Sequence, residues 1–332
     1  QMIARKPTPA ADAVPRSTNM TVEVVYDLPS LEKHAAEWQE LASNSVEPNV
    51  FYEPWMLIPA IRAFGRDADL MYVFIYSKAG RGRPAGLCGF FPLERRRGFR
   101  GLPIPLLSLW RHVHCYLTTP LIRQGSATEV IRTFMEWLHH NQRGCPLMEV
   151  SRASGDGQFA QDFTTELWPE DYYVRSFTRA LIHARDCVDT YLKGAISGSR
   201  RRELRRMRKR LGERGEVRSE LIERPADNPS VIDQFLQLEA SGWKGREGVA
   251  MQCDHDRRSF FEEVATAGME RGQLHFSCLL LDDQPIAMSC DLVSTPGCFA
   301  FKIGFDEQYA SFAPGIMLAL DQINLIHSRP DI

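Results

Sequence analysis

The chain has 332 residues, with 40 Lys and Arg against 42 Asp and Glu, and a formal net charge of −2. Hydrophobic residues make up 44% and charged residues 25%, which excludes a wholly disordered, collagen-like or disulfide-scaffold chain. The near-zero net charge gives no general attraction to nucleic acid or anionic lipid. At about 100–200 residues per domain, the length predicts two domains.

The cysteine pattern favours a reducing, cytoplasmic location. No two of the eight cysteines have C-x-x-C spacing, and several lie in apolar runs, where Cys behaves as a small hydrophobe. His112 and His114 have no Cys, Asp or Glu cluster beside them, so no metal site is expected. No apolar run reaches 18 residues, so no membrane span is expected. Residues 1–20 lack the apolar core of a secretory signal and are expected to form a disordered tail.

The first half predicts a strand, two helices, a hairpin, a further helix and a strand. Apolar spacing of 3.6 indicates the helices, and β-rich runs around a Gly-rich turn indicate the hairpin. In chain order these are a strand over 21–26, helices over 30–43 and 55–64, hairpin strands over 70–77 and 84–93, a Pro-interrupted extended run over 102–121, a helix over 127–141, a strand over 146–151 and an extended crossing between domains over 174–183.

The second half repeats this order. Its expected elements are helices over 233–240 and 257–271, strands over 274–281, 285–294 and 298–305, and a helix over 314–327. The two hairpins also match in detail, since PAGL at 84–87 corresponds to PIAM at 285–288. Internal duplication explains this better than chance, so we expect two similar α/β units, 21–180 and 181–332.

Residues 304–315 (GFDEQYASFAPG) join a strand to a helix. Pro314 fits the first turn of a helix, and Gly315 allows close approach of a ligand to the backbone. The free N–H groups of that turn suit a phosphate or pyrophosphate. An ordinary strand–turn–helix corner would have the same pattern.

The loop at 238–248 combines glycines with Trp243, Lys244 and Arg246. An aromatic side chain beside cations can meet phosphate or carboxylate. The alternative is that Trp243 covers an edge of the core and the two cations are solvated.

Residues 200–214 form a cationic helix in which nine of fifteen residues are Lys or Arg. Without it the chain has 31 basic against 40 acidic residues, so the positive field is concentrated here. It could hold an anionic substrate, nucleic acid or an acidic membrane surface, or it is a solvated face. Its narrow apolar stripe predicts docking on the body of the protein. The side chains expected to point outward are Arg201, Arg205, Arg208 and Arg210.

Taken in order, six segments resemble the CelD/BcsL-like acetyltransferases, a GNAT branch related to FemAB-type aminoacyl transferases. The segments are 49–55 (NVFYEPW), 89–97 (GFFPLERRR), 204–215, 239–248, 285–287 and 302–318. The resemblance implies a mixed α/β, tandem GNAT-like acyl-CoA N-acyltransferase fold with the acyl-CoA groove in the second unit. It also implies cytoplasmic acyl transfer, often linked to cellulose or other exopolysaccharides, and a further strand after Ile332. The usual GNAT pyrophosphate loop is replaced here by residues 311–315.

Residues and resemblance together predict transfer of an acetyl or other acyl group from acyl-CoA to an amine or hydroxyl of a small-molecule or saccharide acceptor. A backbone N–H of strand 298–305 would polarise the thioester carbonyl. The general-base candidates are Glu239, Asp291 and Asp306. The residues expected to bind acyl-CoA are Ile303, Ser311, Phe312, Ala313, Pro314, Gly315 and Met317. Those expected to contact the acceptor are Trp243, Lys244, Arg246 and Lys302.

Two alternatives stay open at this point. One is a non-catalytic accessory protein that uses the scaffold to bind a ligand or to assemble. The other is a FemAB-like transferase that uses aminoacyl-tRNA, with the cationic helix gripping RNA, although specific nucleic-acid binding is otherwise weakly supported. The acceptor, the acyl-chain length and the oligomeric state are not specified by the sequence.

Overall fold

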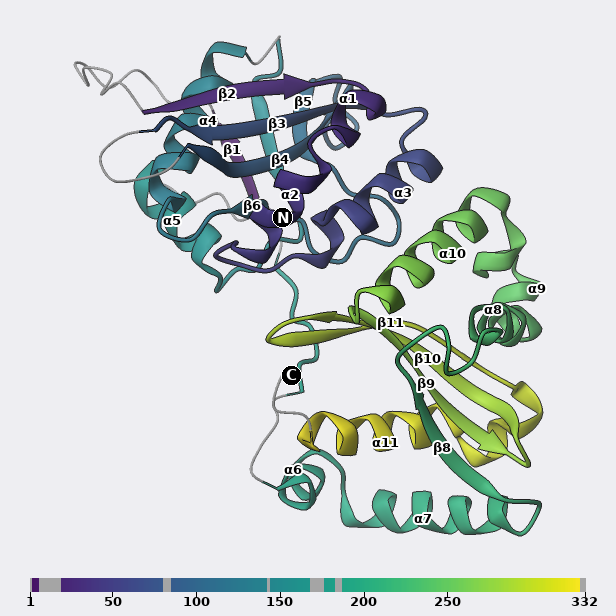
Figure 1. Cartoon of the computed structure of the whole chain (residues 1–332). Coiled ribbons are helices and arrows are strands. Elements are labelled where there is room, and N and C mark those ends of the chain that lie inside the picture. The colour runs from purple at the N-terminus through teal and green to yellow at the C-terminus, as the bar shows by residue number, and fades with distance from the viewer. Residues whose placement is uncertain are drawn as a thin grey trace. The chain divides into compact units, whose positions relative to one another are not determined.

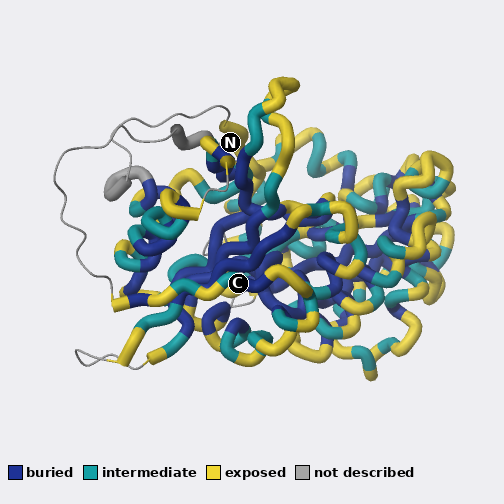
Figure 2. Tube along the Cα trace, turned by 90° about the horizontal axis from the view of Figure 1, so that it is seen from above, coloured by how far each residue is buried: buried dark blue, intermediate teal, exposed yellow. Residues whose placement is uncertain are grey.

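The computed structural model describes residues 2–5, 19–79, 85–141, 144–167, 176–182 and 187–328. The chain divides into two compact units, Gln1–Thr178 and Arg179–Ile332. In both, the central strands are buried, whereas loops and outward helix faces are exposed (Figure 2).

The described part of the N-terminal unit contains a seven-stranded sheet in the order β1-β7-β5-β4-β3-β2, with β6 also beside β4. Its pairs are antiparallel except β5 with β7. The strands are β1 (Met2–Arg5), β2 (Met20–Val25), β3 (Asp69–Ser77), β4 (Gly86–Arg96), β5 (Leu106–Leu109), β6 (Leu121–Ile122) and β7 (Leu147–Val150).

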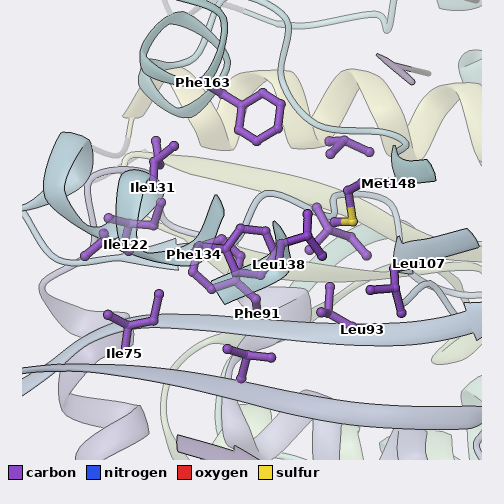
Figure 3. Packing of buried hydrophobic residues seen from close by; sticks show 14 of the residues in the cluster. Ile75, Phe91, Leu93, Leu107, Ile122, Ile131, Phe134, Leu138, Met148 and Phe163 are labelled. Atoms are coloured by element: carbon purple, nitrogen blue, oxygen red, sulfur yellow. The ribbon is translucent and has the colours of Figure 1, made fainter. Parts of the chain in front are cut away.

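Helices cover both faces of this sheet. On one face Phe91 stacks on Phe134 with ring centroids 4.0 Å apart, within the apolar cluster of Figure 3. On the other, Trp38 packs on Phe90 at 4.4 Å. The helices are α1 (Leu28–Glu32), α2 (Ala35–Ser43), the 3₁₀ turn η1 (Val50–Tyr52), α3 (Pro54–Phe64), α4 (Ala127–Asn141) and α5 (Gln158–Leu167).

Two predictions in this unit were wrong in part. The helix expected over 30–43 is broken into α1 and α2 at His34, whose ring stacks on Phe74 at 4.5 Å. Residues 2–5, expected within a disordered tail, form β1 against β7, because a sheet edge offers free backbone groups to an extended segment. Three parts of the predicted organisation lie outside the described residues: residues 6–18 of that tail, the hairpin turn at 80–84, and residues 174, 175 and 183 of the expected crossing.

The C-terminal unit contains a four-stranded antiparallel sheet in the order β11-β10-β9-β8. Its strands are β8 (Val217–Ile222), β9 (Leu274–Leu281), β10 (Gln284–Ser294) and β11 (Gly297–Phe305). The hairpin prediction is confirmed: β9 and β10 turn at Asp282 and Asp283, both with positive φ, as a two-residue type I′ turn requires.

Helices lie on both faces of this sheet too, with α8 and α10 on one side and α7 and α11 on the other (Figure 1). On the latter side, Leu211 of α7 and Met317 of α11 join one apolar cluster with Leu279 and Ala287. The helices are α6 (Val188–Ala195), α7 (Gly198–Gly212), α8 (Val231–Ser241), α9 (Trp243–Arg246), η2 (Met251–Cys253), α10 (His255–Glu270), η3 (Glu307–Phe312) and α11 (Pro314–Ser328).

Candidate functional site

The candidate site lies at β11, one of the two edge strands of the C-terminal sheet (Figure 1). The carbonyl of Ile303 accepts a hydrogen bond of 2.7 Å from Lys244 Nζ, so it points away from β10. In an antiparallel ladder the N–H and C=O of one residue point to the same side. The Ile303 N–H therefore also faces the outer edge, where the Ile303 side chain is 41% exposed.

The end of α8 packs directly on this strand. The Glu239 carboxylate is buried, with Oε1 2.9 Å from Lys244 Nζ and Oε2 accepting from the Met251 N–H at 2.9 Å. Lys244 therefore joins the buried Glu239 to the edge carbonyl of Ile303. Of the residues expected to contact the acceptor, Lys244 is held in place by two partners.

Glu307 binds both ends of the short helix α9. Its carboxylate accepts from the Trp243 N–H and from Arg246 Nη2, both at 2.8 Å. The hydrogen bond from Arg246 lowers the pKa of Glu307 below its usual value. Arg246 is thus engaged within the protein, whereas Trp243 is 47% exposed.

The junction between β11 and α11 lies next to that edge, and the first turn of α11, a long helix, begins there. Asp306 caps η3 by accepting from the Gln308 N–H at 2.9 Å, and Ala313 adopts a left-handed conformation before Pro314. The first turn of α11 contains no acidic residue. A Cβ added at Gly315 would lie 3.6 Å from Ile303 Cδ1, so the helix start and the strand edge are neighbours.

The residues expected to bind acyl-CoA fall into two groups. Phe312, Pro314 and Met317 are buried and anchor the junction in the core. Ser311 and Ile303 are exposed, and Ala313 and Gly315 are half-buried. Only the second group is accessible to a ligand.

The three general-base candidates do not lie together. Glu239 belongs to α8, on one side of the sheet. Asp291 on β10 faces α11 on the other side, where its oxygens accept from Ser289 Oγ at 2.8 Å and Gln322 Nε2 at 2.5 Å. His275 Nε2 lies 3.7 Å from Asp291 Oδ2. Burial raises the pKa of Asp291 to about 7. Asp306 instead serves as the cap of η3.

The cationic helix α7 contacts the α11 junction, which the sequence did not indicate. The guanidinium carbons of Arg210 and Arg214 lie 5.7 and 4.7 Å from the Phe312 ring centroid. Arg205 is exposed, as predicted. The expectation that Arg208 points outward was wrong, because its Nη1 forms an ion pair of 2.8 Å with Asp321 Oδ1 of α11. Half-buried Arg201 donates to the carbonyl of Ile196.

The described residues also bear on metal binding and membrane insertion. Within those ranges, no group of three or more His, Cys, Asp and Glu is arranged to hold a metal ion. Of the helices in the same ranges, none combines the length and apolarity needed to cross a membrane.

Comparisons with known proteins show what the C-terminal unit and the fold resemble. The family model described as an acetyltransferase (GNAT) domain matches residues 198–329. The C-terminal unit is GNAT-like. No curated protein was found to match the chain in sequence.

Two solved structures share the fold over most of the chain. FemX superposes with a TM-score of 0.54 at 11% identity, covering 92% of this chain and 86% of that chain. A conserved protein of unknown function from Bacteroides thetaiotaomicron VPI-5482 superposes with a TM-score of 0.50 at 13% identity, covering 92% and 87%. The predicted mixed α/β, tandem GNAT-like fold is confirmed.

Proposed function

We propose that the C-terminal unit transfers an acyl group from acyl-CoA to an amine or hydroxyl acceptor. The observation that carries this proposal is the outward-facing N–H of Ile303 beside the open first turn of α11. The match of residues 198–329 to a GNAT domain supports it, since such domains generally use acyl-CoA. The acyl chain is acetyl or another acyl group.

The residues at the β11 edge fit such a co-substrate. The Ile303 N–H would donate to the thioester oxygen as negative charge develops there. Gly315 leaves space at the α11 start, and that turn, with no acidic side chain of its own, suits a pyrophosphate. The thioester itself supplies the activated carbonyl that the acceptor attacks.

Asp291 is the general base we favour. A pKa of about 7 lets a carboxylate both accept and release a proton near neutral pH. It shares its sheet face with Ile303, because Ser289, its hydrogen-bond donor, is the register partner of Ile303 on β11. Glu239, which binds Lys244 through Oε1 and the Met251 N–H through Oε2, acts in this scheme by positioning Lys244.

The class of acceptor and the cellular location are also part of the proposal. The resemblance to CelD/BcsL-like acetyltransferases favours a saccharide acceptor connected with exopolysaccharide. A cytoplasmic location fits the eight free cysteines, as thiols persist in reducing compartments.

Two measurements test this proposal. Acyl-CoA turnover is monitored by detecting the free CoA thiol, and CoA binding is measured by calorimetry. We expect one CoA per chain, because the open junction lies in the C-terminal unit. Gly315→Asp should weaken CoA binding at least tenfold, since it places a negative side chain at the pyrophosphate position. Gly315→Ala is the matched control, because its Cβ makes only an ordinary contact, and it should keep nearly full affinity.

Unchanged CoA affinity in a folded Gly315→Asp variant would overturn the placement of the site. A stoichiometry of two CoA per chain would overturn its assignment to the C-terminal unit alone. CoA binding without turnover of any acyl donor would favour the accessory, non-catalytic role.

A further inference from the structure

The ammonium group of Lys244 is fixed at the outer edge of β11 by contacts on two sides. Its Nζ lies 2.9 Å from Glu239 Oε1 and donates to the Ile303 carbonyl at 2.7 Å. The buried Glu239 carboxylate is itself held, because its other oxygen accepts from the Met251 N–H at 2.9 Å. A buried acid on α8 and the edge of the sheet therefore determine where this positive charge lies.

The main chain around Lys244 is fixed as well. The Lys244 carbonyl accepts from the N–H groups of Val249 and Ala250 at 2.8 and 3.1 Å. A Cβ added at the next residue, Gly245, would collide with the Ala240 carbonyl oxygen. The backbone of α9 thus packs against the last turn of α8 at a distance that only glycine permits. Both ends of the Lys244 side chain are therefore preorganised before any ligand binds.

The Lys244 ammonium group has a donor left for a ligand. An ammonium group carries three N–H donors, and in the described part of the chain two of them serve Glu239 and Ile303. The tetrahedral geometry of the nitrogen turns the third donor away from both of these acceptors. Because the Lys244 side chain is 23% exposed, a ligand at the β11 edge can accept from it.

The Lys244 ammonium group adjoins the backbone N–H that we assign to the thioester oxygen. The N–H and C=O of Ile303 point to the same side, so an ammonium group bound to the carbonyl lies beside the N–H as well. Two donors therefore face one small region outside β11. The ammonium group also compensates the Glu239 carboxylate, whose charge would otherwise oppose negative charge developing there.

We propose that Lys244 and the Ile303 N–H together form the oxyanion hole of the acyl transfer. This makes Lys244 a catalytic residue, a role distinct from the contact with the acceptor that the sequence predicted. The assignment rests on the proposed function, because the oxyanion exists only if a thioester is attacked at this edge. It explains why an accessible lysine is held by a buried carboxylate: preorganised donors stabilise developing charge without first having to reorient.

In the proposed step, the acceptor nitrogen or oxygen forms a bond to the thioester carbon, and the carbonyl π electrons move onto oxygen. The resulting oxyanion accepts from the Ile303 N–H and from Lys244 Nζ. When the carbonyl re-forms, the carbon–sulfur bond breaks and CoA leaves as a thiolate, which takes a proton from water. The proton of the acceptor passes to Asp291, the favoured base. Lys244 keeps its own protons and acts through its charge.

The carbonyl stretching band of bound acetyl-CoA reports this contact without turnover. Donation to a carbonyl oxygen weakens its C=O bond, so an isotope-labelled acetyl carbonyl should absorb at lower frequency on the full chain than in water. In Lys244→Met the band should return part of the way toward its value in water. Lys193→Met makes the same exchange at an exposed lysine of α6 and should leave the band unmoved. A purely structural role for Lys244 would change stability without moving the band of the folded variant.

Kinetics with acetyl-CoA and hydroxylamine, a small nucleophile with both an amine and a hydroxyl, give the second readout. Lys244→Met should lower kcat about a hundredfold, the usual cost of losing one oxyanion-hole donor. Its affinity for CoA should be nearly unchanged, because CoA has no acyl carbonyl. Lys244→Arg keeps a cation and should recover about tenfold of that loss, the remainder reflecting its different shape. If Lys244→Met does not fold, Glu239→Gln combined with it removes the buried charge together with its partner.

The outcomes separate the oxyanion hole from the proposed function. If the wild-type chain binds and turns over acetyl-CoA, while Lys244→Met keeps the wild-type band and kcat, the function stands and the role of Lys244 is overturned. A bound carbonyl that absorbs as it does in water overturns the whole oxyanion hole. Absence of CoA binding and of turnover in the wild type overturns the proposed function, and this role with it.

Discussion

Gly304 of β11 lies against the backbone of Glu239 of α8: a Cβ added at Gly304 would be 3.0 Å from Glu239 Cα and 3.1 Å from its backbone nitrogen. Both neighbours are main-chain atoms, which cannot rotate out of the way. This contact fixes the depth at which α8 packs on the edge strand. It thereby sets the position of the Glu239 carboxylate and of Lys244, which reaches the Ile303 carbonyl.

Replacement of Gly304 by alanine should therefore displace α8 from β11. Overpacking of a close contact costs about 1–3 kcal/mol, and we expect a loss of unfolding free energy in that range. Urea denaturation measures it. Gly297→Ala is the control in the same strand, because its added Cβ would lie 3.8 Å from the nearest atom, the Ser294 oxygen. Equal stabilities of the two variants would show that α8 is not held by this contact.

The Glu239–Lys244 pair should show strong energetic coupling. The Glu239 side chain is 3% exposed, so Lys244→Met leaves a buried carboxylate with one fewer partner. Breaking a buried pair from one side costs about 3–5 kcal/mol, and the nearby Lys302 should moderate this loss. A double-mutant cycle with Glu239→Gln, followed by urea denaturation, measures the coupling, which we expect to exceed about 1 kcal/mol. If the stability losses of the two single variants simply add up in the double variant, Glu239 and Lys244 are not energetically coupled.

Stability should fall with rising pH because of Asp291. Its pKa in the folded state is raised to about 7 from an ordinary 3.8, so between these values the folded protein retains a proton that the unfolded chain has released. The stabilising contribution is complete below about pH 4 and is lost as pH rises through 7. At about 1.4 kcal/mol per pH unit, the effect is at most ~4 kcal/mol.

Asp291→Asn isolates this contribution. Glu47 and Glu94, whose pKa values burial also raises, titrate in both proteins and cancel in the difference. Unfolding free energies between pH 4 and 8 should thus decline less steeply in Asp291→Asn than in the wild type. Parallel curves would show that Asp291 titrates near its ordinary value.

Local periodicity predicted most of the long elements in both units. The strand at Leu274–Leu281 and the helix at Ala127–Asn141 coincide with their predicted ranges, because each has a continuous apolar pattern. The strand β8 was missed: only Ile222 of its residues is buried, and its backbone is ordered by pairing with β9. Its sequence alone therefore has no clear alternation.

The contacts of the candidate site that the sequence did not predict are made between residues distant in the chain. Lys244 and Arg246 looked equivalent in a glycine-rich loop, yet Lys244 binds the backbone of Ile303 and Arg246 binds Glu307. Both partners lie about sixty residues away, so spacing within the loop does not distinguish the two cations. The contact between Arg214 and Phe312 also depends on how α7 packs beside η3.

The last prediction concerns the exposed arginines of α7. Arg205 and Arg206 are exposed, whereas Arg208 is tied to Asp321. If the proposed acyl-CoA transfer holds, Arg205→Gln with Arg206→Gln should raise KM for acyl-CoA at low salt and leave kcat unchanged, since surface charge mainly steers association. The difference should shrink as salt rises, because the Debye length is about 8 Å at physiological ionic strength.

Arg208→Gln separates steering from structure. Its half-exposed ion pair contributes at most about 1 kcal/mol, so this variant should lose a little stability and show a smaller salt-dependent change in KM. Steady-state kinetics at roughly 20 to 500 mM salt span Debye lengths above and below the physiological value of about 8 Å. Together with urea denaturation, they distinguish the steering role from the structural role. A collapse of kcat in the Arg205/Arg206 variant would make α7 part of the catalytic machinery. No change at any salt would make its outer side an ordinary solvated surface.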